Sequence, residues 1–402
     1  MTATTPKQDA ITVANWQDSA NLRWAFLHMA ELFPTEAIRA GEPKPSVGLK
    51  HSPSSLHSLA LGLPDGTNTT VADILASTNT DAWMVLKDDV VLAEQYFGSM
   101  QPSTPHLLMS VSKSIVSTVV GILVEEGKID PQQKIEHYIP ELSGSGYRGA
   151  SVRDILDMRS GIKFSEDYLD PGSEVRQLDE AVGWAPRRHG NATTLKQFLM
   201  SLEKARDHGG PFQYRSCETD VLGWLCEAVS GRRFAELASQ LLWSPLGTHQ
   251  DASIAVDAEG TGMFDGGISA SLRDVALFGA MIRDGGVTLD GRRIVDAKWV
   301  DDIFTGGSDS QEAFALGQEA ADMPGGKYRS QFWFLSGDRN VAYCLGIHGQ
   351  MVYINRESGV VGVKFSSTPL PVDPIAGPAA SSMFQAISKS LAGNAGHIVM
   401  QA

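Results

Sequence analysis

A serine followed three residues later by a lysine occurs three times in this chain of 402 residues, at Ser110/Lys113, Ser160/Lys163 and Ser201/Lys204. A cationic or basic group beside a serine can activate the hydroxyl as a nucleophile. The third pair falls in the charged stretch LEKARDHGG and is expected at the surface. The second pair straddles Gly161 at the expected end of a helix, where side chains three apart need not face each other.

The first pair stands at the start of an apolar helix, expected from Ser110 to Glu126 and closed by Gly127. Residues three apart share one face of a helix, and a lysine is rarely buried without a partner or a function. Burial is expected to lower the pKa of Lys113, and its charge would favour an alkoxide on Ser110. The free N–H groups of the helix start also favour negative charge there. From this motif alone, a capping serine followed by a lysine that reaches solvent is equally open.

Two further polar patterns follow along the chain. Tyr214-Arg215-Ser216 precedes an apolar helix expected from Thr219 to Val229, and Ile347-His348-Gly349-Gln350 ends a late strand. A tyrosine can exchange protons with a nearby hydroxyl. Neither pattern identifies a chemistry by itself.

Composition and missing motifs exclude other classes of protein. The net charge is −14, from 33 basic and 47 acidic residues, which argues against nucleic-acid binding and adhesion to anionic membranes. G-x-S-x-G, H-E-x-x-H and Walker A motifs are missing, and the ten histidines lack metal-ligand spacing. A G-x-G-x-x-G match at 144–149 joins two helical segments and is interpreted as a loop. We therefore expect no metal and no cofactor.

The cysteines and the N-terminus bear on the compartment. Three cysteines are too few for a disulfide scaffold, and reduced thiols are the simpler interpretation. The N-terminus has no basic flank followed by an apolar stretch, so no secretory signal is expected. The sequence thus predicts a cytoplasmic protein, and it leaves a homodimer open.

Strand patterns flank a helical middle. A helix around 21–32 and a hairpin over 81–98 are expected early, strands over 331–335, 340–347, 351–355 and 359–367 late, and a last helix over 379–391. In the middle, helices are expected to begin at Asp130-Pro131, at Ser151 and at Ser271. The predicted fold is an α/β domain built from residues 1–105 and 260–402, with an antiparallel sheet flanked by helices, and a mostly helical insertion over 106–259.

The order of the three polar patterns resembles the serine β-lactamase and penicillin-binding-protein superfamily, in its class C and carboxylesterase branch. Similar segments extend from Trp83 onward, among them VEEGKID from Val124 and GGIS from Gly266. The segments HLLMSVSKS, EDYLDPGSEV, FQY and GIHGQ look like the 6-aminohexanoate-dimer hydrolase family, amidases of nylon oligomers with accompanying esterase activity.

This resemblance implies the roles of the site residues. Ser110, Lys113 and Tyr214 would be the catalytic set, with Tyr214 held partly ionised by Lys113. The N–H groups of Ser110 and Ile347 would form the oxyanion hole. The substrate-binding residues would be Tyr168 at the scissile amide, Asp179 at the ammonium end of the substrate, and Trp184, Asp265 and His348. The expected partner is a small amide or ester that can carry a cationic amino end.

Two departures from the family pattern keep alternatives open. Asp265 stands where the amide hydrolase has an asparagine, and an ionised carboxylate cannot donate a hydrogen bond. This favours, as an alternative, a carboxylesterase without useful amidase activity. His348 replaces the lysine of most β-lactamases, which argues against β-lactamase activity. A β-lactamase or D-peptidase is a further alternative, but the lack of a secretory signal fits poorly with cell-wall work outside the cytoplasm. A catalytically silent binding scaffold is the remaining alternative.

Overall fold

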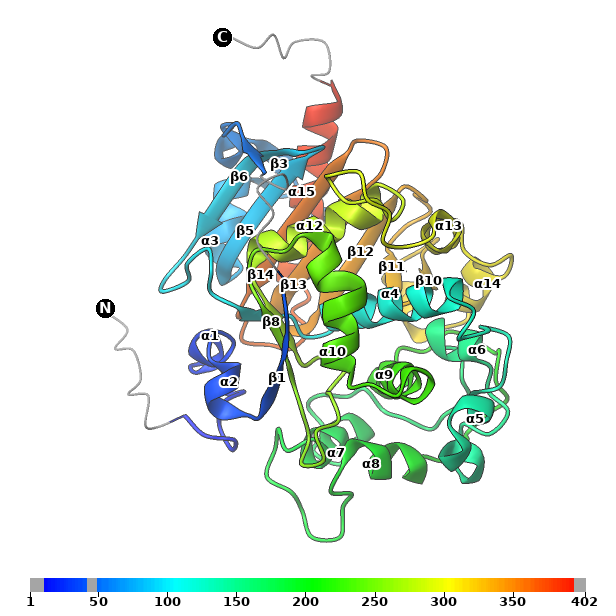
Figure 1. The fold of residues 1–402 in the computed structure, drawn as a ribbon. Helices are drawn as coiled ribbons and strands as arrows, with labels where there is room; N and C mark the ends of the chain where they lie inside the picture. Colours follow the sequence, from blue (N-terminus) through cyan, green and yellow to red (C-terminus); the bar gives the residue numbers. More distant parts are fainter. Residues whose placement is uncertain (1–10, 42–48, 394–402) are drawn as a thin grey trace.

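The computed structural model describes residues 11–41 and 49–393 (Figure 1). Its main sheet has eight strands, in the order β10 (Lys327–Arg329), β11 (Phe332–Phe334), β12 (Val341–Gly346), β13 (Gln350–Asn355), β14 (Val360–Ser366), β5 (Thr80–Lys87), β6 (Val90–Tyr96) and β2 (Lys50–His51). Neighbouring strands are antiparallel except for the parallel pair β2 and β6. Since β14 pairs with β5, the sheet joins strands from both ends of the chain. The prediction of an antiparallel sheet flanked by helices is confirmed.

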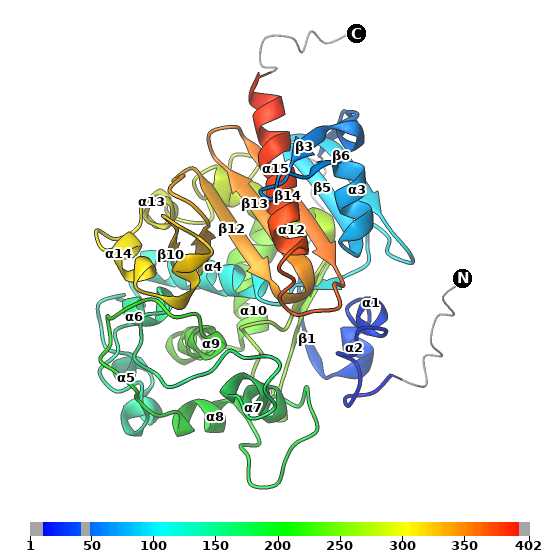
Figure 2. The same cartoon turned by 180° about the vertical axis from the view of Figure 1, so that it is seen from behind.

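Helices cover both faces of this sheet. α12 (Leu272–Arg283) packs on β13, β14 and β5, and Figure 2 shows α15 (Ala376–Gly393) on the opposite face, beside α3 (Val71–Ser77). Glycines allow the close approach on each side. A Cβ on Gly279 of α12 would lie 2.7 Å from Val361, and one on Gly362 of β14 would lie 2.3 Å from the Phe384 ring of α15. The two helices therefore sit at a separation that larger residues would not permit.

The middle of the chain is mostly helical, as predicted. It contains α4 (Val111–Glu125), α5 (Ile135–Tyr138), α6 (Val152–Leu156), α7 (Glu174–Ala181), α8 (Leu195–Ser201), α9 (Ser216–Ser230), α10 (Phe234–Ala238) and α11 (Ser244–Leu246). α4 is buried from Val111 to Leu123 and packs against α9 and β12, which confirms the prediction of a buried helix. The division of the chain into domains at residues 106 and 259 stays a prediction.

A second sheet leads into α4. Its strands follow the order β1 (Thr35–Ile38), β8 (Ala252–Ala255), β9 (Ile268–Ala270) and β7 (His106–Leu107), all antiparallel. β3 (Ala60–Gly62) and β4 (Asn68–Thr70) form a separate hairpin. The remaining helices are α1 (Leu22–Ala25), α2 (Met29–Leu32), α13 (Ala297–Thr305) and α14 (Ser310–Ala315).

Two helix predictions need correction. The helix expected around 21–32 is two short helices, α1 and α2, separated by His28 in a non-helical conformation. The helix expected at Asp130 begins only at Ile135, because Lys134 is extended and bridges Ser151. Over the described ranges, no helix combines the length and the apolar character needed to cross a membrane.

Candidate active site

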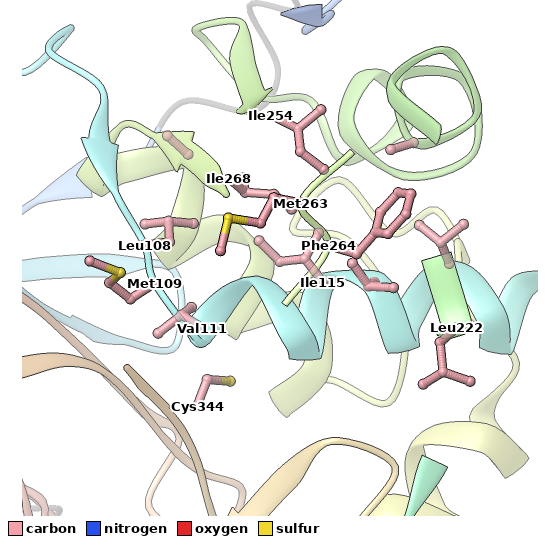
Figure 3. Close-up of a cluster of buried hydrophobic side chains, with 14 of the residues drawn as sticks. Leu108, Met109, Val111, Ile115, Leu222, Ile254, Met263, Phe264, Ile268 and Cys344 are labelled. Carbon is pink, nitrogen blue, oxygen red and sulfur yellow. The ribbon is translucent and has the colours of Figure 1, made fainter. Parts of the chain in front are cut away.

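Ser110 lies at a sharp turn between β7 and α4. It is the residue immediately before the helix, and Met109 in front of it has a φ of +47°, a left-handed conformation that is strained for a methionine. Figure 3 shows the packing that holds this turn, with side chains of α4, β8, β9, α9 and β12 gathered around the helix start. The turn is thus held in place by buried apolar side chains, as a preorganised nucleophile requires.

Lys113 is buried beside Ser110, and all three hydrogens of its ammonium are used. Nζ donates to the Ser110 Oγ at 3.1 Å, to the Ser216 Oγ at 3.1 Å and to the Asp265 backbone oxygen at 2.8 Å. The nearest Asp265 carboxylate oxygen lies 3.5 Å from Nζ. Because Ser110 accepts from Lys113, its own hydrogen is left for another acceptor.

Tyr214 supplies that acceptor. The Ser110 hydroxyl lies close enough to the Tyr214 phenol to lower the pKa of that phenol, and the phenol ring centroid is 5.4 Å from the Lys113 Nζ. The ring packs on Trp333, with centroids 5.1 Å apart, and so is held in place from the sheet side. The structure therefore brings together the three groups that the sequence analysis proposed as the catalytic set.

The charge states of these groups differ from the expectation. Burial alone would lower the pKa of Lys113, but electrostatic interactions with the acidic groups of Tyr214, Asp265, Glu166 and Asp220 outweigh burial and raise the pKa. Burial raises the pKa of Tyr214 to about 12, although the Lys113 charge opposes the shift. At neutral pH the site holds an ammonium and a neutral phenol. Neither the lowered lysine pKa nor the partly ionised tyrosine of the sequence analysis is found.

Glu166 is a site residue that the sequence analysis missed. Its carboxylate accepts hydrogen bonds from the Ser216 Oγ at 2.5 Å, the Ser216 N–H at 2.9 Å and the Tyr168 hydroxyl at 2.6 Å. Burial raises the pKa of Glu166, while the Lys113 charge and these hydrogen bonds oppose the shift. Ser216 thus links the lysine to a carboxylate. Glu166 stands in the EDY segment, but nothing in the spacing of that segment indicates that it reaches Ser216.

The N–H groups of Ser110 and Ile347, which were predicted to form an oxyanion hole, belong to two chain segments that lie close together in space. Gly346, just before Ile347, comes so close that a Cβ there would be 2.7 Å from the Leu108 backbone oxygen. Within the described ranges, neither the Ser110 N–H nor the Ile347 N–H donates to another protein group. Two free donors at a nucleophile are what an oxyanion hole needs.

A pocket of about 330 Å³ opens in front of Ser110. The five residues predicted to bind substrate all line this pocket, as does Ile347 of the predicted oxyanion hole. The five are Tyr168, Asp179, Trp184, Asp265 and His348. Lys113 and Tyr214 are not among the residues that line the pocket. The N-terminal segment 13–18 forms an unpredicted wall, in which the Trp16 Nε1 donates to the Trp184 backbone oxygen at 2.8 Å.

Asp179 does not face the pocket as a free carboxylate. The Arg176 Nη1 contacts its Oδ2 at 2.6 Å and also donates to the Gln17 Oε1 at 2.7 Å. Burial raises the pKa of Asp179 to about 7, against the effect of Arg176 and with a further contribution from Asp265. The sequence indicates Asp179 as a site residue, but no pattern in it indicates Arg176 or Gln17.

Asp265 and His348 complete the polar lining. The Asp265 N–H donates to the buried Asp220 carboxyl at 3.1 Å, and burial raises the pKa of Asp220 well above its usual range. The His348 Nδ1 lies 2.8 Å from the Thr368 backbone oxygen, to which it donates. Burial lowers the pKa of His348, against the effect of that hydrogen bond, so the ring supplies no permanent positive charge.

The described residues contain no group of three or more histidine, cysteine, aspartate or glutamate side chains placed to hold a metal ion.

Comparisons with known proteins agree with this geometry. The family model described as Beta-lactamase matches residues 67–380. The chain is 42% identical, over 365 residues, to the 6-aminohexanoate-dimer hydrolase of Paenarthrobacter ureafaciens, covering 90% of this chain and 89% of that protein. A solved Bacillus anthracis protein, provisionally named 6-aminohexanoate-dimer hydrolase, superposes with a TM-score of 0.87 at 25% identity, over 97% of this chain and 99% of its own.

A family VIII carboxylesterase shares the fold, with a TM-score of 0.60 at 14% identity over 80% of this chain and 96% of its own. The family model covers most of the chain, and the curated relative matches nearly all of it. The chain belongs to the beta-lactamase family and is a serine hydrolase of that family.

Proposed function

We propose that the protein hydrolyses linear amides and esters, 6-aminohexanoate dimer among them, through an acyl-enzyme on Ser110. The observation that carries this proposal is the hydrogen bonding of Lys113. Its ammonium donates to the Ser110 Oγ, so the Ser110 proton is left for the Tyr214 phenol. The 42% identical relative supports the substrate class.

In the first half-reaction, the Ser110 Oγ bonds to the substrate carbonyl carbon and gives its proton to Tyr214. Because the phenol is neutral at neutral pH, the accepting species is the minor phenolate form, which the adjacent Lys113 charge stabilises. The carbonyl oxygen takes the displaced electron pair, and the N–H groups of Ser110 and Ile347 hold it. The intermediate then expels the amine or alkoxide, which takes its proton from Tyr214.

In the second half-reaction, a water molecule replaces the leaving group. Tyr214 accepts a water proton, the hydroxide oxygen attacks the ester carbonyl, and the Ser110 Oγ leaves with the proton returned from Tyr214. Lys113 keeps its charge throughout, since its three hydrogen bonds and the surrounding carboxylates favour the ammonium form.

Substitution of the nucleophile tests the proposal. Ser110→Ala is expected to lower kcat/KM roughly a thousandfold for both nitrophenyl acetate and 6-aminohexanoate dimer. Ser201→Ala is the matched control, because it removes the serine of an exposed Ser-x-x-Lys pair and should leave both rates at the wild-type level. A fluorophosphonate should label Ser110, as read by mass spectrometry. Near wild-type turnover in Ser110→Ala would refute the assignment.

A carboxylesterase without useful amidase activity is a second candidate, and two observations favour it. Asp265 is a carboxylate where the amide hydrolase pattern has an asparagine, and Asp179 is already paired with Arg176. Rates on 6-aminohexanoate dimer and on nitrophenyl acetate, measured side by side, separate the two candidates. A dimer rate no higher than that of Ser110→Ala would select the esterase.

We also propose that the protein acts in the cytoplasm. Cys217, Cys226 and Cys344 are all buried free thiols, which suits a reducing compartment. Cell fractionation with a cytoplasmic marker tests this, and recovery with a periplasmic or extracellular marker would contradict it. A homodimer stays a prediction.

A further inference from the structure

Arg176 lies on α7, one helical turn before Asp179. Residues three apart on a helix lie on the same side, and both side chains line the pocket in front of Ser110. The Arg176 Nη1 lies 2.6 Å from the Asp179 Oδ2. The carboxylate is almost buried, with its side chain 9% exposed, whereas that of Arg176 is 28% exposed. The arginine is therefore the more accessible member of the pair.

Gln17 ties this pair to the N-terminal segment. Its Oε1 accepts from the Arg176 Nη1 at 2.7 Å, and its side chain lies close enough to Asp179 to lower the pKa of that carboxyl. Three side chains from two distant parts of the chain thus meet beside the pocket. Asp179 has an internal cation before any substrate enters.

This arrangement changes what the pocket offers to a substrate. A guanidinium in contact with a carboxylate cancels much of the attraction of that carboxylate for a second cation. In the part of the chain that the structure describes, the Arg176 Nε and Nη2 donate no hydrogen bond, so these atoms would repel an ammonium and favour a neutral end or a hydrogen-bond acceptor.

We propose that Arg176 is a specificity-determining residue that takes the place of a substrate ammonium at Asp179, and that it biases the pocket toward acyl chains with an uncharged end. The inference rests on the proposed function, because it concerns the acyl group that Ser110 receives. It predicts that the protein hydrolyses amino-ended substrates less well than the same site would without the arginine.

Two esters that differ in one charged group test this. Methyl 6-aminohexanoate and methyl hexanoate share the scissile bond and the chain length, so the ratio of their kcat/KM values cancels effects common to both. The ratio is measured by acid release at about pH 9, above the pKa of about 7 that Asp179 has in the wild-type protein, and repeated at higher pH for variants that lack Arg176, whose charge lowers that pKa. Arg176→Gln is expected to raise the ratio of the amino-ended to the neutral ester roughly tenfold.

Two further variants identify the cause. Arg176→Lys keeps a cation at the same place and should leave the ratio within about threefold of wild type. In Arg176→Gln/Asp179→Asn the gain should disappear, because the carboxylate that attracts the ammonium is gone. A ratio that stays level or falls in Arg176→Gln would overturn the inference, as would a rise that survives the loss of Asp179.

Failure of the proposed function would look different. A wild-type protein that hydrolyses methyl hexanoate no faster than Ser110→Ala does would contradict the serine hydrolase mechanism itself. Wild-type turnover of that ester with an unmoved ratio in Arg176→Gln would contradict only the role of Arg176.

Discussion

The groups around Lys113 determine its charge state. Its ammonium is buried, and a lone buried lysine loses its proton readily. Here the surrounding acidic groups outweigh burial, and three acceptors take its three hydrogens. A lysine held in this way stabilises negative charge on Ser110 or Tyr214, and it is a poor proton acceptor.

The raised pKa of Asp179 predicts that the preference for an amino-ended substrate depends on pH. Burial raises its pKa from 3.8 to about 7, so the carboxyl is mostly protonated below pH 7 and ionised above it. The ammonium of methyl 6-aminohexanoate stays charged over this range, since alkylamines titrate near 10. In the wild-type protein the ratio of kcat/KM for the amino-ended ester to that for methyl hexanoate should therefore rise about threefold from pH 5.5 to 8.5.

Taking the ratio removes the pH dependence of the shared proton transfer to Tyr214. Asp179→Asn is the control, and its ratio should stay flat across the same range. A wild-type ratio that falls as the pH rises would contradict the assignment of the titrating group.

At this scale the sequence predicted the reacting groups better than their surroundings. Ser110, Lys113 and Tyr214 stand out because their order along the chain is distinctive. Glu166, Arg176 and Gln17 carry no local pattern, and Arg176 and Gln17 meet across 159 residues of sequence. The pKa directions of Lys113 and Tyr214 were wrong because both depend on the fold: burial raises the pKa of Tyr214, and acidic groups from distant parts of the chain raise that of Lys113.

At the scale of elements, helix ends were predictable where one side chain makes the cap. Ser151 and Asp154 form the expected reciprocal cap of α6, and Gly231 ends α9 in a left-handed conformation. The prediction at Asp130 was wrong because its side chain accepts from the Gln132 N–H in a turn, and the chain becomes extended before α5 begins. A capping residue can also make a turn, and local sequence does not separate the two.

α9 packs closely against the loop that contains Phe264 and Asp265, and Gly223 makes this close packing possible. A Cβ on Gly223 of α9 would lie 2.0 Å from the buried Phe264 ring, and the N–H groups of Phe264 and Asp265 both bond to Asp220 on the same helix. Gly223→Ala should therefore push the loop away from α9. We expect a loss of about 1 to 3 kcal/mol in the free energy of unfolding, measured by denaturant titration.

The same displacement should reach the site. The Asp265 backbone oxygen accepts from Lys113, so Gly223→Ala should also lower kcat on nitrophenyl acetate. Gly144→Ala is the matched control, because nothing lies within 4 Å of its Cβ position, and it should change neither quantity. Wild-type stability in Gly223→Ala would show that the loop is not held as described.

At the scale of the whole molecule, the individual strands could be predicted from the sequence, but the pairing of distant strands could not. The hairpin of β5 and β6 and the strands from β11 to β14 follow from alternating patterns and turns. The pairing of β14 with β5 joins residues 273 to 286 apart in the sequence, from Val360 with Lys87 to Ser366 with Thr80. The N-terminal wall of the pocket likewise depends on contacts such as Trp16 with Trp184, which no local pattern encodes.

That central pairing buries a second lysine, with a different outcome from Lys113. Lys364 on β14 lies opposite Trp83 of β5 and is 1% exposed. Its Nζ donates to the Thr78 backbone oxygen at 3.3 Å and to the Ser366 hydroxyl, and within the described ranges it forms no ion pair. Burial lowers its pKa from 10.5 to about 7, against the weaker effect of the Asp81 charge.

The lowered pKa makes Lys364 a cost to stability that depends on pH. Between pH 7 and 10.5 the unfolded chain binds the lysine proton and the folded chain does not, so the free energy of unfolding rises with pH across that window. Below pH 7 the cost is complete, because the folded protein must hold a buried ammonium.

Lys364→Met fills the same space without a charge and should remove this pH-dependent cost to stability. The stabilisation by Lys364→Met should thus be about 2 to 3 kcal/mol larger at pH 6 than at pH 9. Urea unfolding of both proteins at the two pH values measures it, with Lys298→Met at an exposed helical position as a control that should show no such difference. An effect of Lys364→Met that is equal at pH 6 and pH 9 would mean that the central sheet accommodates this ammonium at no cost.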